Sequence, residues 1–590
     1  MKIGSNDYSL LTKLYFGLLP YQVLLLIINA MNGIIDSLFA SNFIGKTAMS
    51  AIGLYSPITH LLFAVSIVLV SGSQLLAGEA MGRNQTEEVH RVFSTDVVTA
   101  VIISLISSGL LILFSVTGIT NFLVSSQPER DAVKMYVIGQ SFGIPALVLG
   151  QQLFAFLSME NQTKRTTTAS IACIITNIIM NSLLVGVLKL GTLGLGLGSS
   201  AGLWAFLLVM AHFYISGKSE MHFSMKYFSG KGASGILLRG YPGAISRFVE
   251  MFRCVVVNYL VLKYVGSDGL SAFAAVSAVM AVFWPIPFGM LNVTRMIIGI
   301  ILGEEDRTSL VALNKIVVYK CTLLQCGISA IIMALGTPFT MMFYRDVADP
   351  VYQMTLLGFR MMPLCMPLAV ISLHFCCYGQ AVQKKFLSIV LPIFDGVIGV
   401  VSVSLVLIPR IGIKGLYYAN ILNGVFCCIL ILGYAIWFNK RIPRNMAEFI
   451  CIEPSFGVDE DARCDLSIEK KTDVSEEVNK VMEFCERRGI DQKRSHFIGI
   501  TIEEMAGNVV KHGFSKDKKQ HALDVRVTHK NEDVTITFRD NCISFDPSDR
   551  VSAFDKENPI RNLGIRLVSG IAKDFNYQNL LGMNVLTVKF

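Results

Sequence analysis

The sequence has 590 residues, of which 53% are hydrophobic and only 16% are charged, and its mean hydropathy is +0.55. Because soluble globular proteins carry about 25% charged residues, this composition excludes a chain that is soluble along its whole length. The formal net charge of +8 is explained by basic loops between apolar segments, so we do not take it as a sign of nucleic-acid binding.

Up to about residue 440, long apolar segments follow one another with short polar gaps. A helix that spans a membrane needs about 20 consecutive, mostly apolar residues. The first apolar stretch is too long for the core of a signal peptide, so we expect it to stay as an uncleaved anchor. By the length criterion we predict twelve transmembrane helices, at 14–40, 47–72, 93–116, 135–158, 169–190, 194–215, 241–264, 269–300, 313–338, 353–380, 386–408 and 414–437.

The basic residues predict the orientation of these helices, because positive charge concentrates in loops that stay in the cytoplasm. Gaps that follow even-numbered spans are richer in Lys and Arg than the opposite gaps, which hold Lys46, Lys189 and Lys263. We therefore expect a multi-pass protein of the plasma membrane with both termini in the cytoplasm. The chain after residue 440 would then lie where ATP is. The basic pairs and runs are Arg83 and Arg91, Lys164 and Arg165, Lys218 to Arg239, Arg307 and Lys315, Lys384 and Lys385, and Lys440 to Arg444.

The membrane part also repeats itself at an offset of about 221 residues. Six spans plus six spans predict two parallel six-helix repeats, related by an axis along the membrane normal. This arrangement is typical of transporters that bind substrate between the halves. A chance similarity between apolar sequences is the alternative. The matching pairs are Ile44-Gly45 with Val265-Gly266, Ser50-Ala51 with Ser271-Ala272, Ser56 with Ser277, Gly82 with Gly303, and Lys164-Arg165 with Lys384-Lys385.

Three polar side chains interrupt the apolar spans of the first half. Asp36 lies within the first span, where a charged group costs about 2.5–3.5 kcal/mol and usually faces a wet cavity. Asn177 and Asn181 are four residues apart in the fifth span, so they share a helix face. One carboxylate with two amide oxygens suits a hard cation, which predicts a site that exchanges H⁺ or Na⁺. The alternative is that the asparagines only hold helices together.

The second half offers weaker candidates. Glu250 lies early in the seventh span and is flanked by Arg247 and Arg253. It either forms an ion pair with one of these arginines or binds a cationic substrate. Asp395 in the eleventh span has no partner that the sequence reveals, and we interpret His374 in the tenth span as a polar contact within the bundle.

Motifs over about residues 10–440 resemble those of the multidrug and toxic compound extrusion (MATE) transporters. This resemblance implies export of organic or cationic compounds coupled to H⁺ or Na⁺. It also implies that Asp36, Asn177 and Asn181 form the cation site of the first half, and it matches Glu250 to the seventh-helix acid of some members. Other members have an acid in the tenth helix, and this chain has none there. The strings that carry the resemblance are Asp36-Ser37-Leu38-Phe39-Ala40, Ala48-Met49-Ser50-Ala51-Ile52-Gly53, Gly78-Glu79-Ala80-Met81-Gly82-Arg83-Asn84 and Gly240-Tyr241-Pro242-Gly243-Ala244.

After the membrane part, residues 441–464 hold two prolines and mixed charge, and we predict a linker there. The rest of the chain has the pattern of a soluble module in which helical and strand periodicities alternate. This order predicts an α/β sandwich with helices on one face of a sheet. The predicted helices are 474–489, 493–511 and 564–572, and the predicted strands are 522–528, 534–538 and 585–589.

Glu504, Asn508 and His512 recur at intervals of four residues in this module, which would place them along one helix face. A carboxylate there could serve as a general base, and an asparagine oxygen could hold magnesium on phosphates. Asp540 follows a strand and could accept a hydrogen bond from an adenine amine. Gly564 begins a helix whose backbone N–H groups could bind phosphate. The alternative for Glu504 and Asn508 is an ordinary exposed helix face.

In this order the motifs resemble the histidine-kinase-like ATPase fold, and in particular the anti-sigma-factor serine kinases, over about residues 465–590. The resemblance implies ATP and Mg²⁺ as cofactors, with Glu504 as the base and Asn508 as the magnesium ligand. It also implies that Asp540, Asn541 and Gly564 contact the nucleotide. The strings that carry it are Glu503-Glu504-Met505-Ala506-Gly507-Asn508, Arg539-Asp540-Asn541-Cys542 and Asn562-Leu563-Gly564-Ile565-Arg566.

Two positions depart from that family's pattern. Cys542 stands where a glycine follows the aspartate, and Asn562 stands at the first glycine of the phosphate loop. The sequence contains no Walker motif and no helix with a phospho-accepting histidine. These absences argue against an ABC-type motor and against an autophosphorylating sensor kinase.

The sequence thus predicts four parts: transmembrane halves at 1–220 and 221–440, a linker at 441–464 and an ATPase-like domain at 465–590. The primary hypothesis is an ion-coupled antiporter that ATP on the last domain regulates. The alternative is a membrane sensor whose tail phosphorylates serine on a cytosolic STAS-like protein or acts in an anti-sigma-type output. A flippase for lipid or peptidoglycan precursors is a third possibility, because such transporters share this topology.

Overall fold

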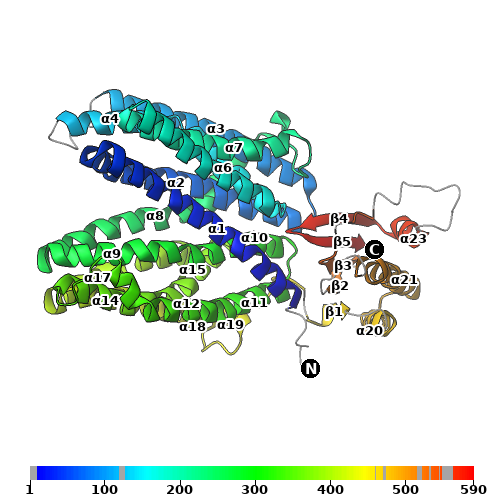
Figure 1. Ribbon diagram of the computed structural model, residues 1–590. Coiled ribbons are helices and arrows are strands. Elements are labelled where there is room, and N and C mark those ends of the chain that lie inside the picture. The colour runs from blue at the N-terminus through cyan, green and yellow to red at the C-terminus, as the bar shows by residue number, and fades with distance from the viewer. Residues whose placement is uncertain are drawn as a thin grey trace.

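The computed structural model describes residues 9–117, 127–458, 460–468, 473–514, 521–530, 533–543, 545–547 and 563–590. Figure 1 shows a long helical part with a smaller sheet domain at one of its ends. Ten helices in the described residues are long and apolar enough to cross a membrane, and the pair formed by α4 and α5, bent by 43°, makes an eleventh span.

In its described residues, the first half contains seven helices and two π-helical turns. Its last two helices, α6 and α7, pack closely along their lengths. The bounds are α1 (Ser9–Phe39), η1 (Ala40–Ile44), α2 (Lys46–Gly82), α3 (Thr86–Val116), α4 (Gln127–Ser141), α5 (Ile144–Met159), α6 (Thr163–Asn181), η3 (Ser182–Val187) and α7 (Gly191–Ile215).

The second half repeats this plan with more interruptions by short turns. Its bounds are η4 (Met225–Tyr227), α8 (Gly230–Tyr264), α9 (Ser267–Phe283), α10 (Pro285–Gly303), α11 (Arg307–Lys315), η5 (Ile316–Cys321), α12 (Thr322–Ala334), α13 (Gly336–Met341), α14 (Pro350–Met361), η6 (Met362–Leu364), α15 (Cys365–Ala381), η7 (Phe386–Val390), α16 (Leu391–Ile393), η8 (Phe394–Ile398), α17 (Gly399–Ile411) and α18 (Ile413–Asn439).

Helix α8 corresponds to the seventh predicted span, and it is the one that falls outside the composition test for a membrane helix. It is 35 residues long, so its length is sufficient. Its charged residues include Arg247, Glu250 and Arg253 in the middle of the helix. With α8 and the bent pair, the structure has a helix for each of the twelve predicted spans.

The repeat predicted from the sequence recurs in the backbone geometry. Gly45 and Gly266 have φ of 106° and 90°, a conformation that is open to glycine and strained for other residues. Asn84 and Glu305 have φ of 62° and 50°. Both pairs are 221 residues apart, so equivalent loops of the two halves turn in the same way.

The two halves approach each other closely near the sheet domain, where α2 packs against α8 and crosses α10. A Cβ atom at Gly78 would lie 3.0 Å from the Cα of Gly299, and one at Gly82 would overlap the backbone of Ile300. Glu79 of α2 also forms an ion pair with Arg239 of α8. The end of the bundle next to the sheet domain is therefore closed by direct contact between the halves.

The segment predicted as a linker packs against the membrane part and contains the short helix α19 (Met446–Phe449). Ile450 and Ile452 are buried in the same apolar cluster as the transmembrane helices. Arg307 at the start of α11 donates to the carbonyl oxygens of Glu453 and Phe456, at 3.1 and 3.4 Å.

The C-terminal domain is a five-stranded antiparallel sheet in the order β1-β2-β3-β5-β4 with helices on one face. Side chains alternate along β2 and β3, so that apolar residues face the helices and polar residues face the membrane part. Figure 1 shows α20, α21 and α23 on the side of the sheet that faces away from the bundle. The bounds are η9 (Glu460–Ala462), β1 (Arg463–Ile468), α20 (Asp473–Arg487), α21 (Gln492–Asn508), η10 (Val509–Gly513), β2 (Leu523–Lys530), β3 (Asp533–Asp540), α23 (Leu563–Ile571), β4 (Asp574–Leu580) and β5 (Met583–Lys589).

Candidate cation and nucleotide sites

Asp36 lies near the end of α1 and is 7% exposed. Its Oδ1 accepts hydrogen bonds from Asn177 Nδ2 at 3.1 Å and from Asn181 Nδ2 at 2.9 Å. Its Oδ2 accepts one from Ser199 Oγ at 2.6 Å. The structure therefore brings together the three residues singled out in the sequence, and it adds Ser199 of α7, which sequence reasoning missed.

The local fold explains this geometry. Asn177 and Asn181 lie one turn apart on α6, and Asn181 Nδ2 also donates to Asn177 Oδ1 at 3.2 Å. Gly198 lets α7 approach so closely that a Cβ atom there would overlap the amide oxygen of Asn181. That oxygen is buried and has no hydrogen-bond partner among the described residues.

These residues fit a small hard cation. The carboxylate, the amide oxygens and the hydroxyl are oxygen ligands, and the buried oxygen of Asn181 is available to coordinate a cation. The π-helical turns η1 and η3 begin directly after α1 and α6, and π-turns inside helices are frequent at functional sites.

Glu250 forms an ion pair with Arg247, with Oε2 3.1 Å from Nη1. Arg253 has no ion-pair partner among the described residues, so the carboxylate of Glu250 serves only one of its two flanking arginines. Of the two roles that the sequence left open for Glu250, the geometry shows the ion pair.

Asp395 has partners that the sequence did not reveal. Its Oδ2 accepts a hydrogen bond from Ser372 Oγ at 2.8 Å, and its Oδ1 accepts one from Asn423 Nδ2 at 2.6 Å. His374 Nε2 lies 2.7 Å from Asn314 Oδ1. This is a polar contact within the bundle, as we interpreted His374 from the sequence. These contacts join residues 23 to 60 positions apart, so only the packed helices could show them.

In the sheet domain, Glu504 of α21 lies against the first turn of α23. A Cβ atom at Gly564 would overlap the Glu504 carboxylate, so the glycine gives this side chain room against α23. The structure thus joins a carboxylate to the helix start that the sequence marked for phosphate. Asn562, the departure in the phosphate loop, lies outside the described residues.

Helix α21 ends at Asn508, and the chain continues as the π-helical turn η10. Glu504 and Asn508 remain one α-helical turn apart, as the spacing predicted. His512 lies within this π-helical turn, about one turn beyond Asn508, and its place on the same face stays a prediction.

Asp540 at the end of β3 is 6% exposed and its Oδ1 is held in place by two donors. Asn584 Nδ2 donates at 2.8 Å and the backbone N–H of Cys542 at 2.9 Å. Burial raises the pKa of this carboxyl, although the two hydrogen bonds oppose the shift. Asn541 Oδ1 instead accepts from the backbone N–H of Ala522 at 3.0 Å, which joins the ends of β2 and β3.

These residues fit a nucleotide. The fixed carboxylate of Asp540 can accept from an adenine amine, and the backbone N–H groups at the start of α23 can donate to phosphate. Asn508 offers an amide oxygen to magnesium. Cys542 occupies the position of the missing glycine and packs on Gly513, where a Cβ would lie 2.8 Å from its Sγ.

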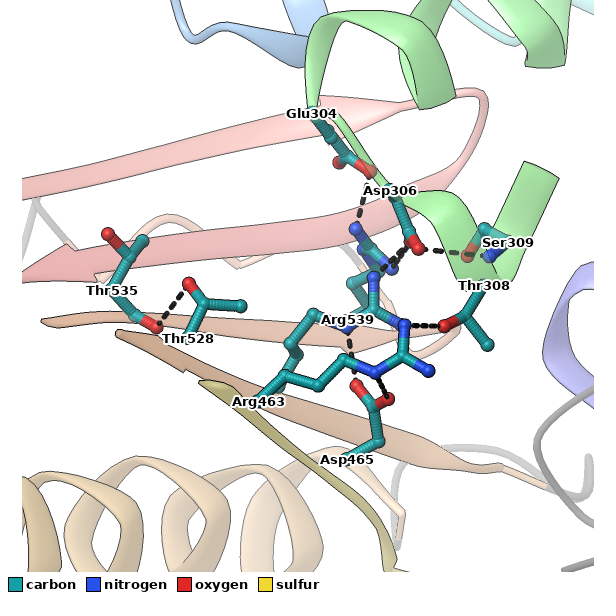
Figure 2. A network of polar contacts seen from close by, with 10 residues as sticks. Glu304, Asp306, Thr308, Ser309, Arg463, Asp465, Thr528, Thr535 and Arg539 are labelled. Carbon is teal, nitrogen blue, oxygen red and sulfur yellow. Dashed lines mark hydrogen bonds and ion pairs between the residues drawn. The ribbon is translucent and has the colours of Figure 1, made fainter. Parts of the chain in front are cut away.

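The polar face of the sheet contacts the loop between α10 and α11, at residues 304–306. Figure 2 shows Arg539 reaching Glu304 and Asp306 in this loop. Arg526 also pairs with Asp306, whose side chain is 1% exposed. Burial alone would raise the pKa of Asp306, but Arg526 and Arg539 hold it well below its usual value. This contact is a buried ion-pair network and not a loose surface contact.

The same sheet reaches the first half as well. Gln578 Nε2 of β4 donates to Asn84 Oδ1 at 2.5 Å, in the loop after α2. Leu580 and Leu581, at the tip of the β4–β5 hairpin, are buried in the apolar cluster of the membrane part. A cavity of about 420 Å³ lies between these loops and the sheet. Because Asn84 is the repeat equivalent of Glu305, the sheet domain touches the same loop in both halves.

Comparison with known families gives two matches. A family model described as MatE matches residues 23–183, and one described as histidine kinase-like ATPase domain matches residues 469–590. The probable multidrug resistance protein NorM of Neisseria meningitidis is 21% identical over 310 residues, which are 51% of this chain and 66% of that protein. The multidrug resistance protein NorM of Vibrio cholerae is 23% identical over 286 residues, 46% of this chain and 61% of that protein. The matches thus span less than two thirds of these relatives.

Solved structures resemble the membrane part in fold. One is an outward-facing conformation of a multidrug resistance MATE family transporter, with a TM-score of 0.66 and 15% identity over 71% of this chain and 94% of that chain. Another is a MOP superfamily transporter from Pyrococcus furiosus, for which the reverse polarity of the binding pocket is said to suggest a different function. It has a TM-score of 0.65 and 15% identity, with the same coverage. The membrane part therefore has the MATE fold, and the C-terminal domain is a histidine kinase-like ATPase domain.

Proposed function

We propose that this chain, in which a MATE-type membrane part is joined to a histidine kinase-like ATPase domain, is an ion-coupled exporter of small organic compounds that ATP regulates. The observation that carries the transport proposal is the buried carboxylate of Asp36, surrounded by three polar side chains inside a membrane bundle. Carboxylates in this position are costly and usually take part in function. The relatives described as multidrug resistance proteins support the same class of activity.

In this proposal Asp36 is the group that couples ion binding to conformation. The donors from Asn177, Asn181 and Ser199 stabilise the ionised carboxylate. Binding of H⁺ removes its charge, whereas binding of Na⁺ requires the amides to turn their oxygens toward the ion. Either event changes the hydrogen bonds that join α1 to α6 and α7, so ion binding alters how α1 packs in the first half.

Regulation by ATP is supported by two neighbouring residues on β3. Asp540 faces the helices, where we place the nucleotide, and Arg539 faces the membrane part, where it holds Glu304 and Asp306. A nucleotide that shifts the end of β3 therefore acts directly on the docking network. Because the same sheet contacts both halves, we propose that nucleotide changes how firmly the two halves are held together. We further propose that the protein lies in the plasma membrane, with both termini in the cytoplasm.

Purified full-length protein in proteoliposomes tests this function. We would impose a H⁺ or a Na⁺ gradient and follow two dyes, the anionic sulforhodamine B and the cationic rhodamine 6G, with and without Mg-ATP. We expect gradient-driven flux of one of the dyes, its loss in Asp36→Asn, and a change of rate with Mg-ATP. Absence of dye flux under both gradients would contradict the transport proposal.

The alternative output, phosphorylation of a STAS-like partner on serine, is separated by a phosphotransfer assay. Glu504 is the base in that reaction, and Glu504→Ala is its control. The replacement of a glycine by Cys542 next to Asp540 is the observation that disfavours rapid turnover. Phosphotransfer in the wild-type protein that Glu504→Ala lacks would assign the domain a kinase activity.

A further inference from the structure

The charged residues in the middle of α8 lie on the side of the helix that faces the protein. Its lipid side is marked by Phe248, Phe252, Val255 and Tyr259, which are 47–65% exposed. These positions are spaced by three or four residues, so they form one face. Val257 and Val261 are buried on the opposite face.

Arg247, Glu250 and Arg253 are not on the lipid face. Counted at 100° per residue, all three lie within about a quarter turn of Val257 and on the side away from Val255. A charged group that cannot reach water along the lipid face must be satisfied by protein or by a bound molecule. Glu250 pairs with Arg247 only, which leaves Arg253 without a carboxylate among the described residues.

A further arginine lies on α10, which follows α8 and α9 in the same half. Arg295 is 6% exposed, and its Nε has no hydrogen-bond partner among the described residues. Arg295 also has no ion-pair partner within the residues that the structure describes. Phe288 is two helical turns away on the same face of α10, and the Arg247 guanidinium lies 4.9 Å from its ring centre. Arg247 lies within electrostatic reach of Arg295.

Asp395, a second carboxylate within the spans of this half, is held by neutral donors. Both oxygens of Asp395 accept hydrogen bonds from Ser372 and Asn423 and form no ion pair with Arg253. The interior of the second half therefore holds three arginines and two carboxylates, of which only Glu250 forms an ion pair among the described residues. Arg253 and Arg295 form no ion pair among the described residues, and Arg247, the third arginine, lies over the ring of Phe288.

We propose that the compounds moved by this protein are organic anions, and that Arg253 and Arg295, with Arg247 and Phe288, bind them in the second half. A guanidinium group binds carboxylate or sulfonate through paired N–H donors and remains charged at all physiological pH values. Phe288 offers an apolar surface to the body of the substrate. This inference rests on the proposed transport function and names its substrate class.

The same proteoliposomes test the proposal with the two dyes, which share a ring system but carry opposite net charge. Sulforhodamine B should move at least about tenfold faster than rhodamine 6G under the coupling gradient. Arg295→Gln should reduce sulforhodamine B flux about tenfold, and Arg295→Lys, which keeps the charge, should retain more flux than Arg295→Gln. Arg253→Glu should shift the preference toward rhodamine 6G, a gain that a misfolded variant cannot show.

Export of rhodamine 6G without sulforhodamine B by the wild-type protein would overturn the anion proposal and leave the transport function standing. Equal sulforhodamine B flux in wild type, Arg295→Gln and Arg253→Glu would also overturn it. No flux of either dye under either gradient would remove both the transport function and the inference built on it.

Discussion

The cation site depends on how closely two helices approach at single residues. Gly198 of α7 touches the amide oxygen of Asn181, and a Cβ atom at this position would overlap it. Alanine there forces Asn181 away from Asp36 or pushes α7 away from α6, and overpacking of this kind costs about 1–3 kcal/mol. We expect Gly198→Ala to lower gradient-driven dye flux about tenfold in proteoliposomes.

Gly109→Ala is the matched control, because a Cβ atom at Gly109 of α3 has no atom within 4 Å. Both substitutions add one methyl group to a helix, and only one of them reaches the cation site. Equal flux in the two variants would show that the position of Asn181 does not matter for coupling.

Part of this site was visible in the sequence, and part was not. Asp36, Asn177 and Asn181 are polar residues inside apolar spans, and the two amides have the spacing of one helix face. Ser199 lies in a stretch rich in glycine and serine, where nothing distinguishes one hydroxyl from the next. Its hydrogen bond to Asp36 joins residues 163 positions apart and depends on how α1 packs on α7.

Glu160, in the loop between α5 and α6, gives a pH-dependent stability. Burial raises its pKa to about 7, although Ser219 and the backbone of Met221 donate to Oε1. The folded state thus favours the protonated form. This contribution to stability is present in full below the unfolded pKa of 4.5 and is lost as the pH rises through about 7. The difference corresponds to about 3 kcal/mol.

We expect Glu160→Gln, which mimics the protonated form, to remove this dependence. The unfolding temperature of the wild-type protein in detergent should fall more between pH 5 and pH 8 than that of the variant. A parallel fall in both proteins would show that Glu160 does not titrate in this range.

At the scale of elements, periodicity predicted the helices and the central strands, because each buries one regular face. β4 was not predicted, since Asp574–Leu580 has only two aromatic residues, Phe575 and Tyr577, among polar ones and is ordered by its pairing with β5. β1 was also not predicted. One reason is that it begins within the segment predicted as a linker. The charges within α8 did not mislead the prediction, because its length and apolar lipid face outweighed them.

Strand β3 carries the docking contact through Arg539. Breaking a buried ion pair by removing one partner costs about 3–5 kcal/mol, because the other charge is left unpaired. We expect Arg539→Glu to abolish the effect of Mg-ATP on flux while gradient-driven flux persists. The exchange variant Arg539→Glu with Glu304→Arg should restore at least part of the ATP effect.

Lys530→Glu is the control for that experiment. Lys530 pairs with Glu305 at 2.5 Å, but both side chains are about half exposed. Exposed pairs of this kind contribute about 1 kcal/mol or less. An ATP effect that survives in Arg539→Glu as fully as in Lys530→Glu would disconnect the docking network from regulation.

At the scale of the whole molecule, the sheet domain contacts equivalent loops of both halves. The 221-residue offset could be read from the sequence, and so could the presence of the C-terminal domain. The contact between the C-terminal domain and the repeated loops could not be predicted from the sequence. It depends on which residues of β2, β3 and β4 face outward and on where the loops at residues 84 and 305 lie. The polar outer face of a sheet normally indicates solvent, and here it contacts the membrane part.

Deletion of residues 459–590 tests this arrangement. It keeps Ile450 and Ile452, which are buried against the bundle, and removes the hairpin tip at Leu580 and Leu581 together with the ion pairs to residues 304–306. We expect the shortened protein to retain Asp36-dependent flux, to lose its response to Mg-ATP and to unfold at a lower temperature. An unchanged response to Mg-ATP would place the regulatory nucleotide outside the C-terminal domain, whereas complete loss of flux in a folded protein would show that the sheet domain is required for transport itself.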